Sequence, residues 1–144
     1  MIESRHLGRS FLAVLSGYLA LSIVIVLLTP VAVWLFIPQE LLKQRPVAYT
    51  DAYIISNFVY SFAAGVLGGW VTARMAPRSP FPHGAALAGI MAVIALGDIM
   101  AKGTAEAAAH QPSWYGWAIT LTTAAGALAG GWLRARQVQQ AVTS

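Results

Sequence analysis

Asp98 is an acidic residue inside an otherwise apolar run of the sequence. Ionisable side chains are costly within a bilayer, so such a residue is a candidate for handling ions or protons. Lys102 follows four positions later, and an acid four residues before a base is the favourable order for pairing on a helix. Two interpretations stay open: an interfacial ion pair near a helix end, or an ion- or proton-linked site.

Asn57 lies in the preceding apolar run and is expected at a depth similar to that of Asp98, with Tyr53 and Ser56 close by. An amide both donates and accepts hydrogen bonds, so Asn57 can tie two helices together or help to bind a ligand. Asp98, Asn57 and Lys102 together are the candidate polar site within the membrane.

The other polar residues form no catalytic or metal-binding pattern. His6, His83 and His110 are isolated and expected on different sides of the membrane, which argues against a metal site. The chain has no Cys, and therefore no thiolate ligand or redox thiol. We find no H-E-x-x-H motif, phosphate loop or nucleophile triad. We therefore predict no catalytic residue, metal or cofactor. An enzyme acting at the outer interface through Asp98, Glu106 and His110 remains a third hypothesis.

The composition of the chain indicates the environment in which these residues lie. The chain has 144 residues, of which 58% are hydrophobic and 10% charged, and its mean hydropathy is +0.65. Soluble domains carry about 25% charged residues, so this chain is expected in a membrane, as one transmembrane domain over 1–144. The net charge of +4 does not indicate a nucleic-acid partner, because the basic residues sit singly or in pairs at the ends of apolar runs.

Four apolar runs are each about 20 residues or longer, the length that a helix needs to cross roughly 30 Å of hydrocarbon. Strict two-residue alternation, the pattern of a barrel, is absent, so the predicted fold class is all-α, a bundle of four transmembrane helices. Pro30 is expected to kink the first run unless the helix tilts. Asp51 and Ser113 are the expected N-caps of the second and fourth. The expected helices cover about 11–37, 52–76, 81–101 and 113–133.

The distribution of Lys and Arg predicts the orientation, because cytoplasmic flanks collect basic residues. Both termini are therefore expected in the cytoplasm, with the protein in the inner membrane. Six basic residues fall on the side of the termini and three on the other: Arg5, Arg9, Arg74, Arg78, Arg134 and Arg136 against Lys43, Arg45 and Lys102.

The second and fourth runs end with the same pattern, G-G-W-x-x-A-R, which starts at Gly68 and at Gly130. Upstream, the Ala-Ala-Gly triplets that end at Gly65 and Gly126 correspond after a one-residue shift. The pattern is either a parallel duplication of two hairpins or a chance recurrence. The Trp and Arg of each copy, four residues apart, are either cation–π pairs or separate interfacial anchors.

Small residues recur every four positions along three of the runs, which lets helix backbones approach closely in lipid. These stripes predict a tight core of the second, third and fourth helices, with the first helix more peripheral. A seam between two copies of the chain is the alternative. The residues expected to pack are Ser61, Gly65, Gly69, Gly89, Gly97, Gly126 and Gly130.

The segment G-G-W-x-x-A-R-x-x-P, followed by Pro-His-Gly-Ala-Ala-Leu, resembles a type of small four-helix membrane protein of bacteria. The resemblance covers chiefly Gly65 to Gly89. It implies a bacterial inner membrane and carries no activity with it.

Two functions fit these observations best. The first is a structural, accessory or regulatory role without catalysis, in contact with the lipid bilayer and with a second copy or another membrane protein. Abundant packing motifs without a buried ionisable cluster motivate it. The alternative is a small transporter or channel, oligomeric because four helices enclose little lumen, with Asp98 and Asn57 near the outer end of its path.

Overall fold

The computed structural model describes residues 2–43, 49–76, 79–102 and 114–143. Within these ranges the chain forms five helices and no strand. The helices are α1 (Ile2–Phe36), α2 (Gln39–Leu42), α3 (Asp51–Met75), α4 (Pro80–Lys102) and α5 (Tyr115–Thr143).

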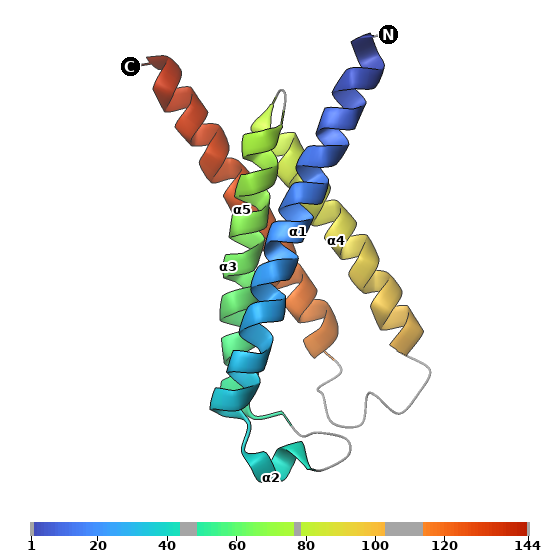
Figure 1. Cartoon of the computed structure of the whole chain (residues 1–144), viewed down its shortest axis with the longest axis vertical. Helices are drawn as coiled ribbons and strands as arrows, with labels where there is room; N and C mark the ends of the chain where they lie inside the picture. Colours follow the sequence, from blue (N-terminus) through green and yellow to red (C-terminus); the bar gives the residue numbers. More distant parts are fainter. Residues whose placement is uncertain (1, 44–48, 77–78, 103–113, 144) are drawn as a thin grey trace.

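The four long helices cross one another near the middle and diverge toward both ends (Figure 1). The start of α1, the end of α5 and the α3–α4 connection lie at one end of the molecule, which we call the terminal end. The short helix α2 and the start of α3 lie at the opposite end, which we call the α2 end. Helices α3 and α5 therefore run in the same direction, and α1 and α4 run against them.

Three helical segments are long and apolar enough to cross a membrane: Gly8–Phe36, Asp51–Met75 and Pro80–Gly97. The expected fourth span is not among them. Helix α5 is rich in Ala, Gly and Thr, which are less apolar than Leu, Ile or Val, although it is long enough. The chain is thus an all-helical protein with three candidate membrane spans.

Two helices extend beyond the expected ranges into polar sequence. Helix α1 begins at Ile2 and continues through Pro30, and α5 runs ten residues past the expected end at 133. The extension of α5 contains Arg, Gln and Ala, which are good helix formers once a packed segment has nucleated the helix.

Thr50, and not Asp51, caps α3. Its Oγ1 accepts a hydrogen bond from the backbone N–H of Tyr53 at 3.2 Å and donates one to the carbonyl oxygen of Phe36 at 2.7 Å. The second bond ties the start of α3 to the end of α1. Ser113, the other expected cap, lies outside the described residues.

Helices α3 and α5 make the closest contact in the structure, and it is built on glycine. A Cβ added to Gly65 would collide with the carbonyl oxygen of Thr123 and lie 3.2 Å from the Cα of Gly126. A Cβ added to Gly126 would collide with the carbonyl oxygen of Phe62 and lie 3.2 Å from the Cα of Gly65. The two contacts are equivalent when α3 and α5 are exchanged, so a local two-fold axis relates the two parallel helices where they meet.

The same relation holds one turn along, where Gly69 lies against Ala127 and Gly130 against Val66. The contacts pair the residues of α3 and α5 as the two Ala-Ala-Gly triplets do, one residue out of step with the G-G-W-x-x-A-R pattern. Small residues at these positions let the two backbones touch directly, which is how helices associate in lipid.

Helix α1 packs on α3 through glycine as well, and it is not peripheral. A Cβ at Gly68 would lie 2.8 Å from the carbonyl oxygen of Gly17, and one at Gly17 would overlap the side chain of Thr72. Thr72 is fully buried there, at 0% exposure. The expectation that the first helix is more peripheral than the other three fails at this contact with α3.

Helix α4 joins the core through its first turns rather than through the stripe expected from the sequence. A Cβ at Gly84 would lie 2.9 Å from the Cα of Gly131 on α5, and Leu87 and Ala88 are buried. Gly89 and Gly97 are exposed, and no described atom lies within 4 Å of a Cβ at either. The expectation that these two glycines pack in the core is wrong, because α4 turns another face to its neighbours.

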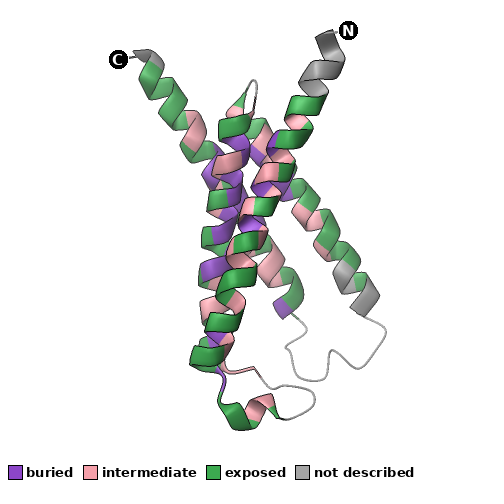
Figure 2. Ribbon diagram, viewed as in Figure 1, coloured by how far each residue is buried: buried purple, intermediate pink, exposed green. Residues whose placement is uncertain are grey.

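All these glycine contacts lie at the middle of the bundle or in the half toward the terminal end. Many buried residues lie where the helices cross, and the lower part of α4 is exposed or half-buried (Figure 2). Toward the α2 end α1 stays packed on α3 through a second buried cluster, Ala32, Ile37, Tyr53 and Tyr60, whereas α4 diverges (Figure 1).

Gly65→Ala tests the α3–α5 contact, with Gly89→Ala as the matched control. The added methyl of Gly65→Ala meets backbone, and we expect it to lower the free energy of unfolding in detergent by about 1–3 kcal/mol. Gly89→Ala should be neutral or stabilising, because Ala favours a helix by up to about 1 kcal/mol and the site is open. Thermal unfolding followed by tryptophan fluorescence measures both. Equal effects of the two substitutions would contradict the packing described.

Candidate functional site

A cavity of about 410 Å³ lies between the four long helices, on the side of the crossing toward the α2 end. It lies beyond the glycine contacts, on the side where α4 diverges from α1 and α3 (Figure 1). Hydroxyl and amide groups project into an otherwise apolar wall from α1, α3 and α5: Ser22, Thr29, Tyr53, Asn57, Tyr60, Ser61, Thr120 and Thr123.

Asn57 is the centre of the polar network. Its Nδ2 donates a hydrogen bond to the hydroxyl of Tyr115 on α5. Its Oδ1 accepts a hydrogen bond from the hydroxyl of Ser61, one turn along α3, at 3.0 Å. The amide thus joins α3 to α5 where their backbones are no longer in contact, and both of its polar atoms are partnered.

A second hydrogen bond joins α3 to α1 across the same cavity. Thr29 donates its hydroxyl proton to the carbonyl oxygen of Ile25 at 2.7 Å. Because that proton is used, the hydroxyl of Tyr60 must be the donor in its 3.2 Å contact with Thr29 Oγ1. Tyr60 therefore holds α1 against α3 at the level of the cavity.

Aromatic rings pack beside Asn57 and Tyr53 toward the α2 end. Tyr49 stacks on Tyr53, with ring centroids 5.0 Å apart. Phe58 of α3 packs against the rings of Trp114 and Tyr115, with centroids 6.2 and 6.0 Å away. These contacts surround the ring of Tyr115, the partner of Asn57.

The site expected from the sequence is only partly described. Asn57 lies in the cavity wall. The side chains of Asp98 and Lys102 lie outside what the structure describes, so their pairing and their relation to Asn57 stay predictions. Glu106 and His110 also fall outside the described residues.

Sequence reasoning did not identify the partners that Asn57 uses. The sequence carried one indication that Tyr115 is a special position, because it stands 62 positions after Tyr53, at the same offset as the G-G-W-x-x-A-R repeat. Ser61 was predicted as a packing residue, and it is buried at 3% exposure while it bonds to Asn57. Thr29 and Tyr60 had no signal, because their contact depends on how α1 crosses α3.

Of the two interpretations of the Trp–Arg spacing, the structure shows the cation–π pairs, at the terminal end. The Arg74 guanidinium carbon lies 5.2 Å from the ring centroid of Trp70, and that of Arg136 lies 3.8 Å from the ring centroid of Trp132. Both are within the range of cation–π contacts. Trp70 also donates to Gln137 Oε1 at 3.3 Å, which fixes the ends of α3 and α5 at one level.

Comparison with models of protein families, with curated proteins and with solved structures gives no match. The function must therefore be argued from the chemistry of the cavity. The polar groups on its described wall are hydroxyls and one amide, which form hydrogen bonds without carrying charge. Such a wall suits an uncharged molecule that has a hydrogen-bonding group and an apolar part.

A double-mutant cycle of Asn57→Ala and Tyr115→Phe tests the bond between α3 and α5. We expect each substitution to destabilise the protein and the pair to show a coupling energy of about 0.6–1.7 kcal/mol, the range for hydrogen bonds between membrane helices. Thermal unfolding of the four proteins in detergent measures the coupling. Thr122→Ala replaces Tyr115→Phe in the control cycle, because Thr122 bonds to its own helix at Ala118. Coupling that is absent from the first cycle would refute the bond.

Proposed function

We propose that the chain crosses the membrane four times, with both termini in the cytoplasm. The support is the position of α5, which packs along the middle of α3 through Gly126 and Gly130. A helix in contact with the centre of a membrane span lies within the bilayer itself. The small residues that lower the hydropathy of α5 are those that let it approach α3.

The charges at the two ends support the same topology. Described side chains at the terminal end include Arg9, Arg74, Arg134 and Arg136, whereas Glu40, Lys43 and Asp51 lie at the α2 end. Basic residues collect on the cytoplasmic side. The Trp–Arg pairs of α3 and α5 then lie at the inner interface, where aromatic and basic side chains anchor helices.

Within this topology we propose an accessory or regulatory role: the protein binds an uncharged, hydrogen-bonding molecule from the bilayer and carries out no reaction on it. The observation that carries this proposal is the cavity around Asn57, whose largely apolar wall carries hydroxyls and one amide. Polar groups inside a membrane are expensive and mark functional sites. The cavity opens between helices, so a ligand dissolved in lipid reaches it sideways.

Transport by an oligomer is the second candidate, and one observation favours it. The cavity shares Tyr18 and Ile94 with a groove that continues between α1 and α4 toward the terminal end. Together they follow α1 from Ser10 to Thr29, which covers most of the bilayer. A solute could follow this route if α4 moved relative to α1.

Cysteine labelling tests the topology, since the natural chain has no Cys. Single substitutions Gly8→Cys, Glu40→Cys and Ala141→Cys place one thiol at each end of α1 and one at the end of α5. A membrane-impermeant maleimide should label only Glu40→Cys in intact cells and all three after permeabilisation. Labelling of Ala141→Cys in intact cells, with Gly8→Cys still protected, would indicate three spans.

Photolabelling tests the binding role. A diazirine-bearing octanol, irradiated with the protein in liposomes, should label the peptides of α1 and α3 that line the cavity. Asn57→Leu should reduce this labelling about tenfold, the loss expected for one or two hydrogen bonds in an apolar site. A diazirine-bearing octane, which lacks the hydroxyl, is the matched probe and should label all lipid-facing surfaces evenly. Identical patterns for the two probes would contradict the proposal.

A flux assay separates binding from transport. Liposomes that contain the protein should take up glycerol and protons no faster than empty liposomes if the role is accessory. Uptake that exceeds this background and is lost in Asn57→Leu would overturn the accessory role in favour of the transporter.

A further inference from the structure

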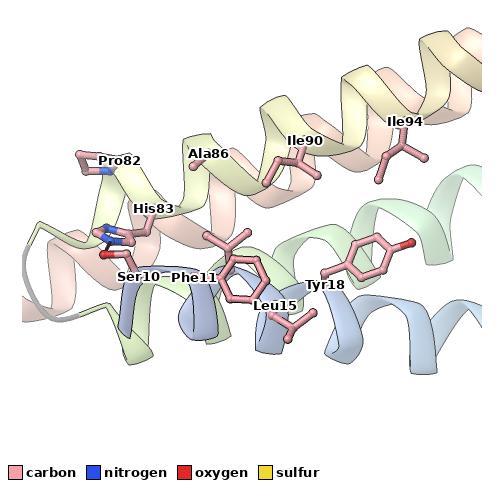
Figure 3. A pocket seen from close by; sticks show the side chains of 10 residues that line it. Ser10, Phe11, Leu15, Tyr18, Pro82, His83, Ala86, Ile90 and Ile94 are labelled. Carbon is pink, nitrogen blue, oxygen red and sulfur yellow. Dashed lines mark hydrogen bonds between the residues drawn. The ribbon is translucent and has the colours of Figure 1, made fainter. Parts of the chain in front are cut away.

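The groove between α1 and α4 has a different chemistry from the cavity around Asn57. Its volume is about 510 Å³, and its wall is almost wholly apolar, with Phe11, Val14 and Leu15 on one side and Ala86 and Ile90 on the other. The two helices are close at its terminal end and diverge toward Ile94, so the groove opens sideways (Figure 3). In a membrane this opening faces the acyl chains.

A hydrogen-bonded pair, Ser10 and His83, marks the narrow end of the groove (Figure 3). His83 Nδ1 lies 3.1 Å from the carbonyl oxygen of Ser79, which can only accept, so Nδ1 carries a proton. Nε2 lies 3.0 Å from Ser10 Oγ. When the ring is an imidazolium, Nε2 donates to Ser10, and the hydroxyl proton of Ser10 is free to bond to an anion.

We propose that this groove binds one anionic phospholipid, with an acyl chain along its apolar wall and the phosphate at Ser10 and His83. The site adjoins the cavity around Asn57 at Tyr18 and Ile94 and needs no ligand there. It depends on the chain being embedded in a bilayer, as the apolar spans indicate.

The length of the groove fits one leaflet. Between His83 and Ile94 the helix rises about 16 Å at 1.5 Å per residue. Half of a typical hydrocarbon core is about 15 Å. A lipid whose phosphate lies at the terminal end therefore has its chain end near Tyr18 and Ile94, where the groove meets the cavity.

The charge at this end favours an anionic head group. Arg9 precedes Ser10 on α1 and is exposed, and Arg74, Arg134 and Arg136 lie at the same end of the bundle. The acidic side chains that the structure describes, Glu40 and Asp51, are at the α2 end. Juxtamembrane basic residues each contribute about 1 kcal/mol to the attraction of anionic lipid.

The Ser10–His83 pair fits binding better than acyl transfer. A serine nucleophile needs paired donors for the oxyanion that forms on attack. Two of the first three residues of α4, Pro80 and Pro82, have no N–H, so this helix end offers few donors beside Ser10. The pair holds a phosphate but does not assemble the rest of a catalytic site.

Native mass spectrometry of the purified protein tests the proposal, with equal amounts of phosphatidylglycerol and phosphatidylcholine added in a non-ionic detergent. The wild type should retain one phosphatidylglycerol in preference. His83→Phe and Ser10→Ala should each weaken that retention about tenfold, the effect of losing one hydrogen bond to a charged group. Ala86→Trp, which fills the groove, should also lose the lipid.

Arg136→Lys is the control, because it changes a side chain at the same end but outside the groove and keeps the positive charge. It should retain the lipid as the wild type does. Retention in Ser10→Ala and His83→Phe, or an equal loss in Arg136→Lys, would overturn the proposal. Displacement of the lipid by inorganic phosphate alone would show a simple anion site and would overturn it too. Ser10→Ala removes one atom, so it keeps the test decisive even where the larger substitutions fail to fold.

Discussion

The direct backbone contact between α3 and α5 is the constraint on which the rest of the structure depends. In lipid no hydrophobic force draws two helices together, so association depends on close packing. Gly65 and Gly126 leave no side chain between the helices, and each lies against the backbone of the other. Because the two parallel helices present equivalent residues, the contact has the local two-fold form of a dimer within one chain. A side chain at either position would force the axes apart.

Helices α1 and α4 join this pair through further glycines, Gly17 against Gly68 and Gly84 against Gly131. These contacts also lie toward the terminal end. The close contact of α4 is near its start, at Gly84, and α4 diverges from α1 and α3 toward the α2 end (Figure 1). The cavity around Asn57 lies on that side of the crossing.

Hydrogen bonds between side chains add to the packing in the half toward the α2 end. Asn57 bridges to Tyr115, and Tyr60 bridges to Thr29, so both α5 and α1 are bonded to α3 beyond the glycine contacts. Buried side chains of α1 and α3 pack in the same region. The groove between α1 and α4 has no such bridge along its apolar length and is bonded only at its narrow end, through Ser10 and His83. The protein thus offers the bilayer two openings of different chemistry, one lined with hydroxyls and one apolar.

By itself the sequence determined that the chain is helical and has apolar runs long enough to span a membrane, because runs of this length must satisfy their backbone groups internally in lipid. It also identified Gly65, Gly69, Gly126 and Gly130 as sites of close approach, and the two Trp–Arg pairs, because both are set by spacing along one helix. Only the tertiary structure decided which stripes meet: Gly89 and Gly97 have the same spacing, yet they face outward. It also decided that Asn57 bonds to Tyr115 and that Ser10 lies beside His83. A stripe or a polar residue belongs to one helix, whereas a contact depends on the facing surface and the crossing geometry of two, which no periodicity along the chain encodes.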